Sequence, residues 1–169
     1  MWKAIARFEF AYHLKQPLFY LAAATLFLMG LGLVTSDLGL TFGKAPTQID
    51  RNAPFVIVNC LTFMSLVGLF VITAYVAGSV LRDFEQNTHM LFFSRPVKKF
   101  DFLLGRFAGS MAISFTLFLM LALGLMAGHI APWQDPERIA PFRLVPYAYG
   151  LLVMVLPNLL MMGALFFAV

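Results

Sequence analysis

Few side chains in this sequence are suited to metal binding or to nucleophilic chemistry. His13, His89 and His129 lie in three different segments, and Cys60 is the single cysteine. Because Cys60 lies alone in an apolar run, the chain can form no internal disulfide and no cysteine-based metal site. The sequence contains no Gly-rich phosphate loop of the G-x-x-x-x-G-K-S/T kind, no Ser/His/Asp arrangement and no H-E-x-x-H. We therefore expect no catalytic residue, no metal site and no cofactor in this chain.

The composition indicates a membrane protein rather than a soluble domain. Hydrophobic residues make up 61% of the 169 residues and charged residues only 12%, which is about half the charged fraction of an ordinary soluble domain. The formal net charge is +4, but the basic residues flank apolar runs and do not gather into one patch. The charge is therefore better explained by membrane topology, and we expect no nucleic-acid partner.

Four apolar runs are long enough to cross a bilayer as helices. They predict spans at about residues 17–35, 54–81, 102–130 and 147–169, which together form one transmembrane domain over 17–169. The second run is longer than the hydrocarbon core requires, so its helix should tilt or project into the cytoplasm. The fold class that we expect is all-α, a polytopic membrane protein.

The last predicted span has two features of its own. Pro157 and Asn158 lie in its middle, where a proline leaves a carbonyl in need of another partner, so we expect the helix to break there. The run is still apolar at Val169. We therefore expect this span to be truncated and the sequence to belong to a longer chain.

Small residues in the third span predict where other helices approach it. Gly105 and Gly109 form one small-xxx-small pair, and Gly124 and Gly128 form a second. Such pairs allow close packing of membrane helices. His129 ends the span, and we interpret it as a boundary residue rather than a ligand.

Two loops outside the spans contain similar sequences, R-N-A-P-F at 51–55 and R-I-A-P-F at 138–142. Each precedes a predicted span that runs inward. A shared chemistry of helix entry, with proline at the start, is enough to explain the similarity. We do not interpret it as an internal repeat.

Residues 1–16 predict an amphipathic helix that lies in the membrane interface. Ile5, Phe8 and Tyr12 fall at helical spacing, while cations such as Lys3 and Arg7 occupy other positions. This pattern is typical of helices whose cations lie near anionic lipid headgroups. The alternative is a charged N-terminal flank without this role.

The distribution of Lys and Arg orients the predicted spans. Three precede the first span and five lie within 82–106, whereas the two loops on the other side hold two each. Cytoplasmic loops carry the excess of Lys and Arg. We therefore expect the N-terminus and the 82–101 loop to be cytoplasmic, and the protein to lie in the inner (cytoplasmic) membrane.

The charged connector between the second and third spans, residues 82–101, has a helical pattern of its own. Phe84, Thr88, Leu91 and Phe92 fall at helical spacing, with polar residues between them. Pro96 disfavours further helix. We expect a short amphipathic helix at the cytoplasmic face, followed by a turn.

Three stretches in this region, R-D-F-E-Q-N-T from Arg82, L-F-F-S-R-P-V from Leu91 and F-L-L-G-R-F from Phe102, resemble the membrane subunit of type-2 ABC transporters. Asn87 stands where that family more often has Gly, and Arg106 where it more often has Lys. The resemblance implies a permease domain of six spans with an N-terminal elbow helix, of which this chain would hold the N-terminal part. It also implies two partners, an ABC ATP-binding subunit and a second permease domain.

In that family this loop is the coupling helix, which docks on the ATP-binding subunit. By resemblance, the charged residues would meet the ATPase, while the aromatic and leucine side chains would fill an apolar groove or face the spans. The residues that we assign to coupling are Arg82, Asp83, Phe84, Glu85, Thr88, Leu91 and Phe92. The alternative is a lipid-facing interfacial helix whose charges are only solvated.

A polar stripe on the second span predicts a translocation path or a dimer contact. Its members lie within about a third of the helix circumference and are Asn59, Thr62, Ser65 and Thr73. Ser and Thr can also bond to carbonyls of their own helix, which is the alternative, but an Asn amide has more groups to satisfy. We expect this stripe, rather than the opposite face with Cys60 and Tyr75, to line the path or the contact.

The sequence thus favours a transport permease subunit that works with a separate ATPase. A non-transporting membrane anchor or scaffold of a larger complex is the alternative from another class. A membrane-embedded enzyme is disfavoured, because the spans lack clustered ionisable groups.

Overall fold

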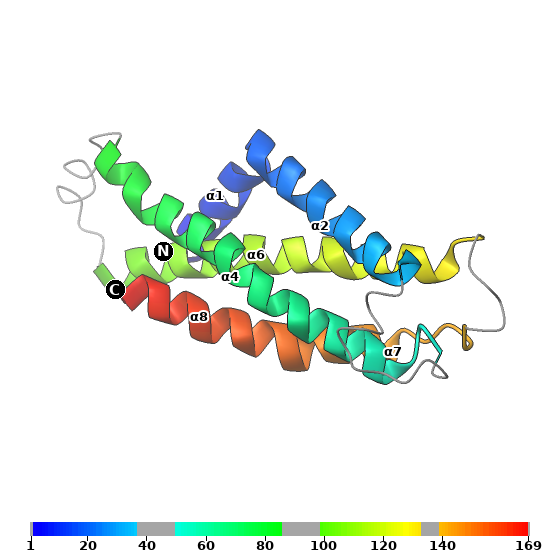
Figure 1. Ribbon diagram of the computed structural model, residues 1–169. Coiled ribbons are helices and arrows are strands. Elements are labelled where there is room, and N and C mark those ends of the chain that lie inside the picture. The colour runs from blue at the N-terminus through cyan, green and yellow to red at the C-terminus, as the bar shows by residue number, and fades with distance from the viewer. Residues whose placement is uncertain (1, 37–49, 86–98, 133–138, 169) are drawn as a thin grey trace.

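Every regular element in the described part of the chain is a helix (Figure 1). The computed structural model describes residues 2–36, 50–85, 99–132 and 139–168, with the backbone alone at 69, 72, 74, 76–85, 99 and 166–168. The elements are α1 (Trp2–Leu14), α2 (Pro17–Thr35), α4 (Pro54–Glu85), α6 (Lys99–Ile130), α7 (Val145–Tyr149), the π-helical segment η2 (Gly150–Val155) and α8 (Leu156–Ala168). The predicted all-α class is confirmed.

Three helical stretches are long and apolar enough to cross a membrane: Pro17–Thr35, Phe100–Ile130 and Val145–Leu165. They coincide with the first, third and fourth predicted spans. α4 covers the second predicted span, and its apolar stretch among the described residues is Pro54–Gly68. By length and composition, these helices indicate a membrane protein, as the sequence predicts.

The two ends of the helical bundle differ in which elements meet there (Figure 1). At one end, which we call the connector end, α4 finishes and α6 begins. At the opposite end, α2 and α6 finish, while α4 and α7 begin.

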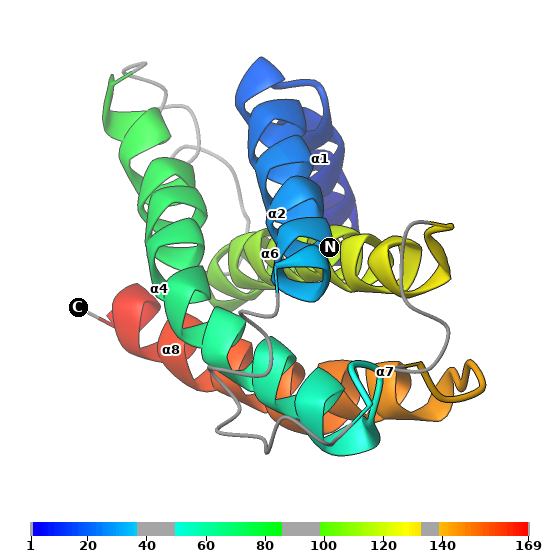
Figure 2. The ribbon, with the colours of Figure 1, turned by 45° about the vertical axis from the view of Figure 1, so that its right-hand side comes forward.

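Both N-terminal helices pack against α6, and each does so at one of its glycine pairs (Figure 2). A Cβ atom at Gly109 would lie 2.6 Å from Cβ of Glu9, on α1. A Cβ atom at Gly124 would overlap the backbone carbonyl of Phe27, on α2. Both small-xxx-small pairs are therefore helix contacts, as predicted: the first pair receives α1 and the second receives α2.

The other side of α6 meets α4 and the C-terminal helices, which pack against one another. Gly150 allows close approach here, because a Cβ atom on it would lie 2.5 Å from Cδ1 of Leu61. The most deeply buried apolar side chains lie among these helices and include Leu61, Met64, Ile113, Leu117, Phe118, Leu121 and Val155. This packing holds α4 beside α8.

The break expected around Pro157 is wrong, because the helix continues from Val145 to Ala168. A wider turn precedes the proline: in η2 the N–H of Leu156 bonds to the carbonyl of Leu151, five residues earlier. A π-helical turn changes the hydrogen-bond register and is a recognised way for a helix to bend without stopping. The proline is thus accommodated within a continuous helix.

Candidate functional site

The residues assigned to coupling lie at the end of α4 and in the segment that follows it. Arg82, Asp83, Phe84 and Glu85 form the last turn of α4, of which only the backbone is described. Thr88, Leu91 and Phe92 lie outside the described residues. Their role in coupling stays a prediction.

The polar stripe of α4 does not share one environment. Asn59 donates its amide to the carbonyl of Phe55 at 3.1 Å, and Thr62 donates its hydroxyl to the carbonyl of Val58 at 2.8 Å. Both side chains therefore bond to their own helix, which is the alternative that the sequence left open. Thr62 is exposed on the chain, and Asn59 is half-buried.

Ser65 belongs to the stripe in sequence but lies inside the bundle. Its side chain is buried, donates to the carbonyl of Thr62 at 2.6 Å and accepts a 2.8 Å bond from the Asn158 amide of α8. The opposite face, with Cys60 and Tyr75, is also buried. The outward-facing part of the stripe is therefore the part around Thr62.

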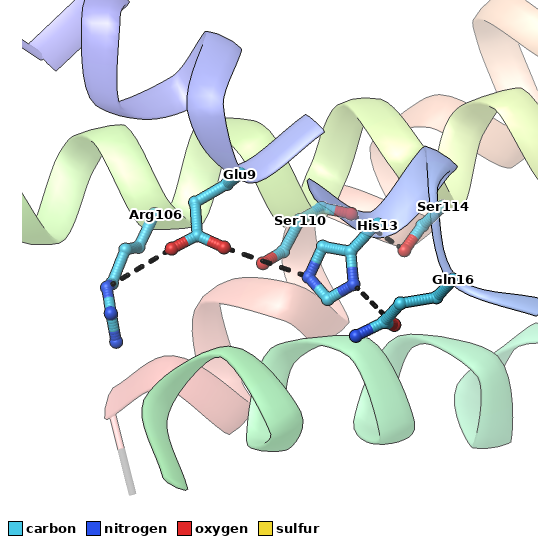
Figure 3. A network of polar contacts seen from close by, with 6 residues as sticks. All are labelled: Glu9, His13, Gln16, Arg106, Ser110 and Ser114. Carbon is cyan, nitrogen blue, oxygen red and sulfur yellow. Dashed lines mark hydrogen bonds and ion pairs between the residues drawn. The ribbon is translucent and has the colours of Figure 1, made fainter. Parts of the chain in front are cut away.

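A buried group of charged and polar side chains lies near the connector end, where α1 crosses α6 (Figure 3). Glu9 and His13 of α1 and Arg106 of α6 are 1%, 4% and 4% exposed. The carboxylate of Glu9 lies 3.5 Å from Nε of Arg106 and 3.8 Å from Nε2 of His13. We call these three residues the ionic cluster.

The ionic cluster is enclosed by groups from three elements. His13 Nδ1 lies 3.3 Å from Oε1 of Gln16, in the turn between α1 and α2. The His13 ring meets the Tyr75 ring of α4 edge-on, with centroids 5.1 Å apart. The guanidinium of Arg106 lies over the Phe102 ring, 4.6 Å from its centroid. Charged side chains that are buried this far need such partners.

Small polar residues continue along α6 from the ionic cluster. Ser110 and Ser114 are fully buried, and the Ser114 hydroxyl donates to the Ser110 carbonyl at 2.9 Å (Figure 3). Hydroxyls bonded to their own helix in this way satisfy themselves within an apolar interior. The polar character of this face of α6 therefore extends beyond Arg106.

The three residues of the ionic cluster belong to segments that no single sequence pattern connects. Two features of the sequence could have predicted that these residues meet. Glu9 and His13 are four residues apart, which places them on the same face of a helix. Arg106 is a single cation inside an apolar span, where an ionisable residue usually has a specific partner.

A second buried polar group lies at the opposite end, and it is built from uncharged contacts. His129 Nδ1 contacts the Tyr147 hydroxyl closely, and its Nε2 lies 3.2 Å from the Arg51 carbonyl. His129 lies at the end of α6, as predicted, and its ring also joins α6 to α7 and to the segment that precedes α4. A ring donating from one nitrogen and accepting at the other satisfies both contacts.

The two similar loop sequences meet directly at this end. The Asn52 amide donates to the Ala140 carbonyl, and the Ala140 N–H donates to Oδ1 of Asn52 at 2.8 Å. Asn52 therefore pairs with the backbone of the other loop in both directions. The similarity of the two sequences is accompanied by a contact that the sequence analysis did not anticipate.

Within the described residues, no group of three or more His, Cys, Asp or Glu side chains could hold a metal ion. The buried polar groups instead join helices to one another. Comparisons with protein-family models, with curated proteins and with solved structures found no match to this chain.

Proposed function

We propose that this chain is part of the permease domain of a type-2 ABC transporter, driven by a separate ATP-binding subunit. The observation that carries the proposal is the sequence of the connector, in which R-D-F-E-Q-N-T, L-F-F-S-R-P-V and L-L-G-R follow one another between two apolar helices. ATP binding on the partner would move the coupling helix, and the spans would pass that movement to a path between two permease domains.

The fold is compatible with this proposal in two respects. The helices on either side of the connector, α4 and α6, finish and begin at the same end of the bundle (Figure 1). α1 packs on the first turns of α6 at that end, which is where an elbow helix would have to lie. The proposed topology has four spans in this chain, with α4 as the second, and a cytoplasmic N-terminus and connector.

The proposed orientation can be tested with single cysteines in a Cys60→Ala background. We expect cysteines at Ser36 and Gln134 to react with an impermeant thiol reagent added outside intact cells, and a cysteine at Gln86 to be protected. The reverse pattern of labelling would show that the topology is inverted.

Coupling can be tested in the full transporter, reconstituted with its ATP-binding subunit. Buried aromatic side chains at interfaces usually contribute more binding energy than charges at the rim. We therefore expect Phe84→Ala to reduce transport per ATP hydrolysed more severely than Glu85→Gln. Coupling equal to the wild type in both variants would exclude the connector from the mechanism and favour the anchor or scaffold alternative.

The proposed path or dimer contact is centred on the outward-facing part of the α4 stripe. Thr62 is exposed, whereas Cys60 and Tyr75 on the other side of the helix are buried. In the assembled transporter, we expect a cysteine at Thr62 to be labelled from water or crosslinked to a second domain. Reactivity centred on position 60 instead would place the path elsewhere.

A further inference from the structure

The ionic cluster contains a histidine whose two ring nitrogens both face oxygen atoms that can accept a hydrogen bond or balance a positive charge. His13 Nε2 faces the Glu9 carboxylate at 3.8 Å, and Nδ1 faces the side-chain oxygen of Gln16 at 3.3 Å. This arrangement suits the doubly protonated ring, in which both nitrogens are donors. The ring is 4% exposed, so these contacts, rather than bulk water, determine which form is held.

The same surroundings also suit the neutral ring. Rotating the Gln16 amide by half a turn would present its NH₂ group to Nδ1, which then accepts, while Nε2–H still points to Glu9. Gln16 lies in the two-residue turn between α1 and α2, outside both helices. One amide rotation therefore lets the site hold His13 with or without its second proton.

We propose that His13, held between Glu9 and Gln16, is a proton-binding site whose occupancy sets how firmly α1 is held against α6. The groups facing His13 come from every described element around it. They are Glu9 and Tyr12 of α1, Arg106 of α6 through the shared carboxylate, Tyr75 of α4, and Gln16 of the turn. The inference does not depend on the proposed transport function.

The direction of the effect follows from the charges. With neutral His13, the Glu9 carboxylate and the Arg106 guanidinium compensate each other across the α1–α6 contact. A proton on His13 draws the carboxylate toward a cation on its own helix, and among the described residues the cluster then has two cations for one carboxylate. Adding a second cation beside the same buried carboxylate weakens the pairing of Glu9 with Arg106, so protonation weakens the attachment of α1 to α6.

The attachment can be measured as a distance between spin labels on the two helices. Phe8 on α1 and Leu103 on α6 are exposed, at 63% and 48%, so labels can replace them in a Cys60→Ala background of the full chain. On lowering the pH from about 8 to about 5, across the range in which histidine titrates, we expect the distance distribution to broaden and lengthen reversibly. An unchanged distribution overturns the proposal.

Variants of the three histidines identify which side chain binds the proton that changes the distance between the labels. We expect His13→Gln to abolish the pH response while keeping the narrow distribution seen at high pH. His129→Gln and His89→Gln are matched controls and should respond as the wild type does. A response that persists in His13→Gln, or that disappears only in a control, shows that the proton binds elsewhere.

Gln16→Leu provides a second test if His13→Gln does not fold. Hydrogen bonds to charged groups are worth more than bonds to neutral ones, so losing the amide destabilises the protonated ring more than the neutral ring. We expect the midpoint of the transition to move to lower pH in Gln16→Leu. A midpoint equal to that of the wild type contradicts the role given to Gln16 and overturns the site as proposed.

Discussion

The two ends of this molecule join their helices in different ways. At the opposite end, Asn52 is paired in both directions with the Ala140 backbone, and His129 bridges Tyr147 and a backbone carbonyl. Near the connector end, Glu9 and Arg106 join α1 to α6 through opposite charges. The Asn52–Ala140 pair contains no titratable group and keeps the same strength over a wide pH range, whereas the strength of a buried ionic pair depends on every charge around it.

The two ends therefore differ in how strongly the contacts between their helices depend on pH. At one end, hydrogen bonds join α6 to α7 and to the segment that precedes α4, and join that segment to Ala140. The charged contact joins α1 to α6 near the other end, and its strength depends on the charge of His13. The following variants test that difference, in order of decreasing expected effect on stability.

The largest effect is expected from Arg106→Ala, which removes the guanidinium that faces the buried Glu9 carboxylate. We expect a loss of about 3–5 kcal/mol in the free energy of unfolding, because removing one partner of a buried ion pair is strongly destabilising. Denaturant unfolding in detergent, followed by circular dichroism, measures this loss. The paired replacement Glu9→Leu with Arg106→Met should recover most of it, and failure to do so would show that the charges are not the cause.

The next effect is expected from Gly124→Ala, where the added Cβ atom would overlap the carbonyl of Phe27 on α2. Overpacking at a tight contact costs about 1–3 kcal/mol, and we expect a loss of this size. Gly32→Ala is the matched control, because a Cβ atom there meets nothing within 4 Å. The same unfolding measurement should show no loss for Gly32→Ala, and equal losses in both variants would contradict the close approach of α2 to α6.

At the opposite end, Asn52→Ala removes both hydrogen bonds to the Ala140 backbone. Leaving a buried donor or acceptor unpaired costs about 1–3 kcal/mol, and Ala140 is half-buried, so the lower part of that range is expected. The loss should be the same at about pH 8 and about pH 5, since no group in the Asn52–Ala140 pair titrates there. A strongly pH-dependent loss would remove the contrast between the two ends.

The smallest effect is expected from the hydrogen bond between Asn158 and Ser65, which joins α8 to α4. Hydrogen bonds between membrane helices are worth about 0.6 kcal/mol on average. A double-mutant cycle of Asn158→Ala and Ser65→Ala should give a coupling energy of about this size. A cycle of Asn158→Ala with Thr116→Ala, whose hydroxyl bonds to its own helix, should give a coupling energy near zero.

The sequence predicts the helices of this protein well, because length and apolarity are strong signals in a membrane protein. The first predicted span, 17–35, has the same limits as α2, and the third, 102–130, begins three residues after α6 does. The glycine pairs also predict which parts of α6 receive other helices. These signals depend only on local composition.

The inward face of α1 could not be predicted in the same way. Hydrophobic periodicity places Ile5, Phe8 and Tyr12 on one face, yet Phe8 is 63% exposed, whereas Glu9 and His13 are buried. In a soluble protein the apolar face would be the buried one, but a helix in contact with lipid can direct apolar residues outward. Only the need of Glu9 for a distant counter-charge identifies the buried face, and that partner is far away in sequence.

The hydrogen bonds at the opposite end also could not be predicted from the sequence. Asn52 bonds to backbone groups of Ala140. Because almost every residue type has the same backbone N–H and carbonyl, the sequence does not indicate which residue will be the partner. The partners of His129 likewise come from two separate parts of the chain, Tyr147 in α7 and Arg51 before α4. Such contacts depend on how helices are arranged in space, which no local pattern of residues contains.

The seating of α1 on Gly105 and Gly109 has a consequence for how the chain is made. Both glycines are translated long after α1 has left the ribosome, since α2 and α4 come between them in the sequence. During synthesis, α1 therefore has no access to its α6 partner until that helix has been made. Its docking on α6 is then a late step of biogenesis, and a chain released before the third long helix is complete will lack a fixed N-terminus.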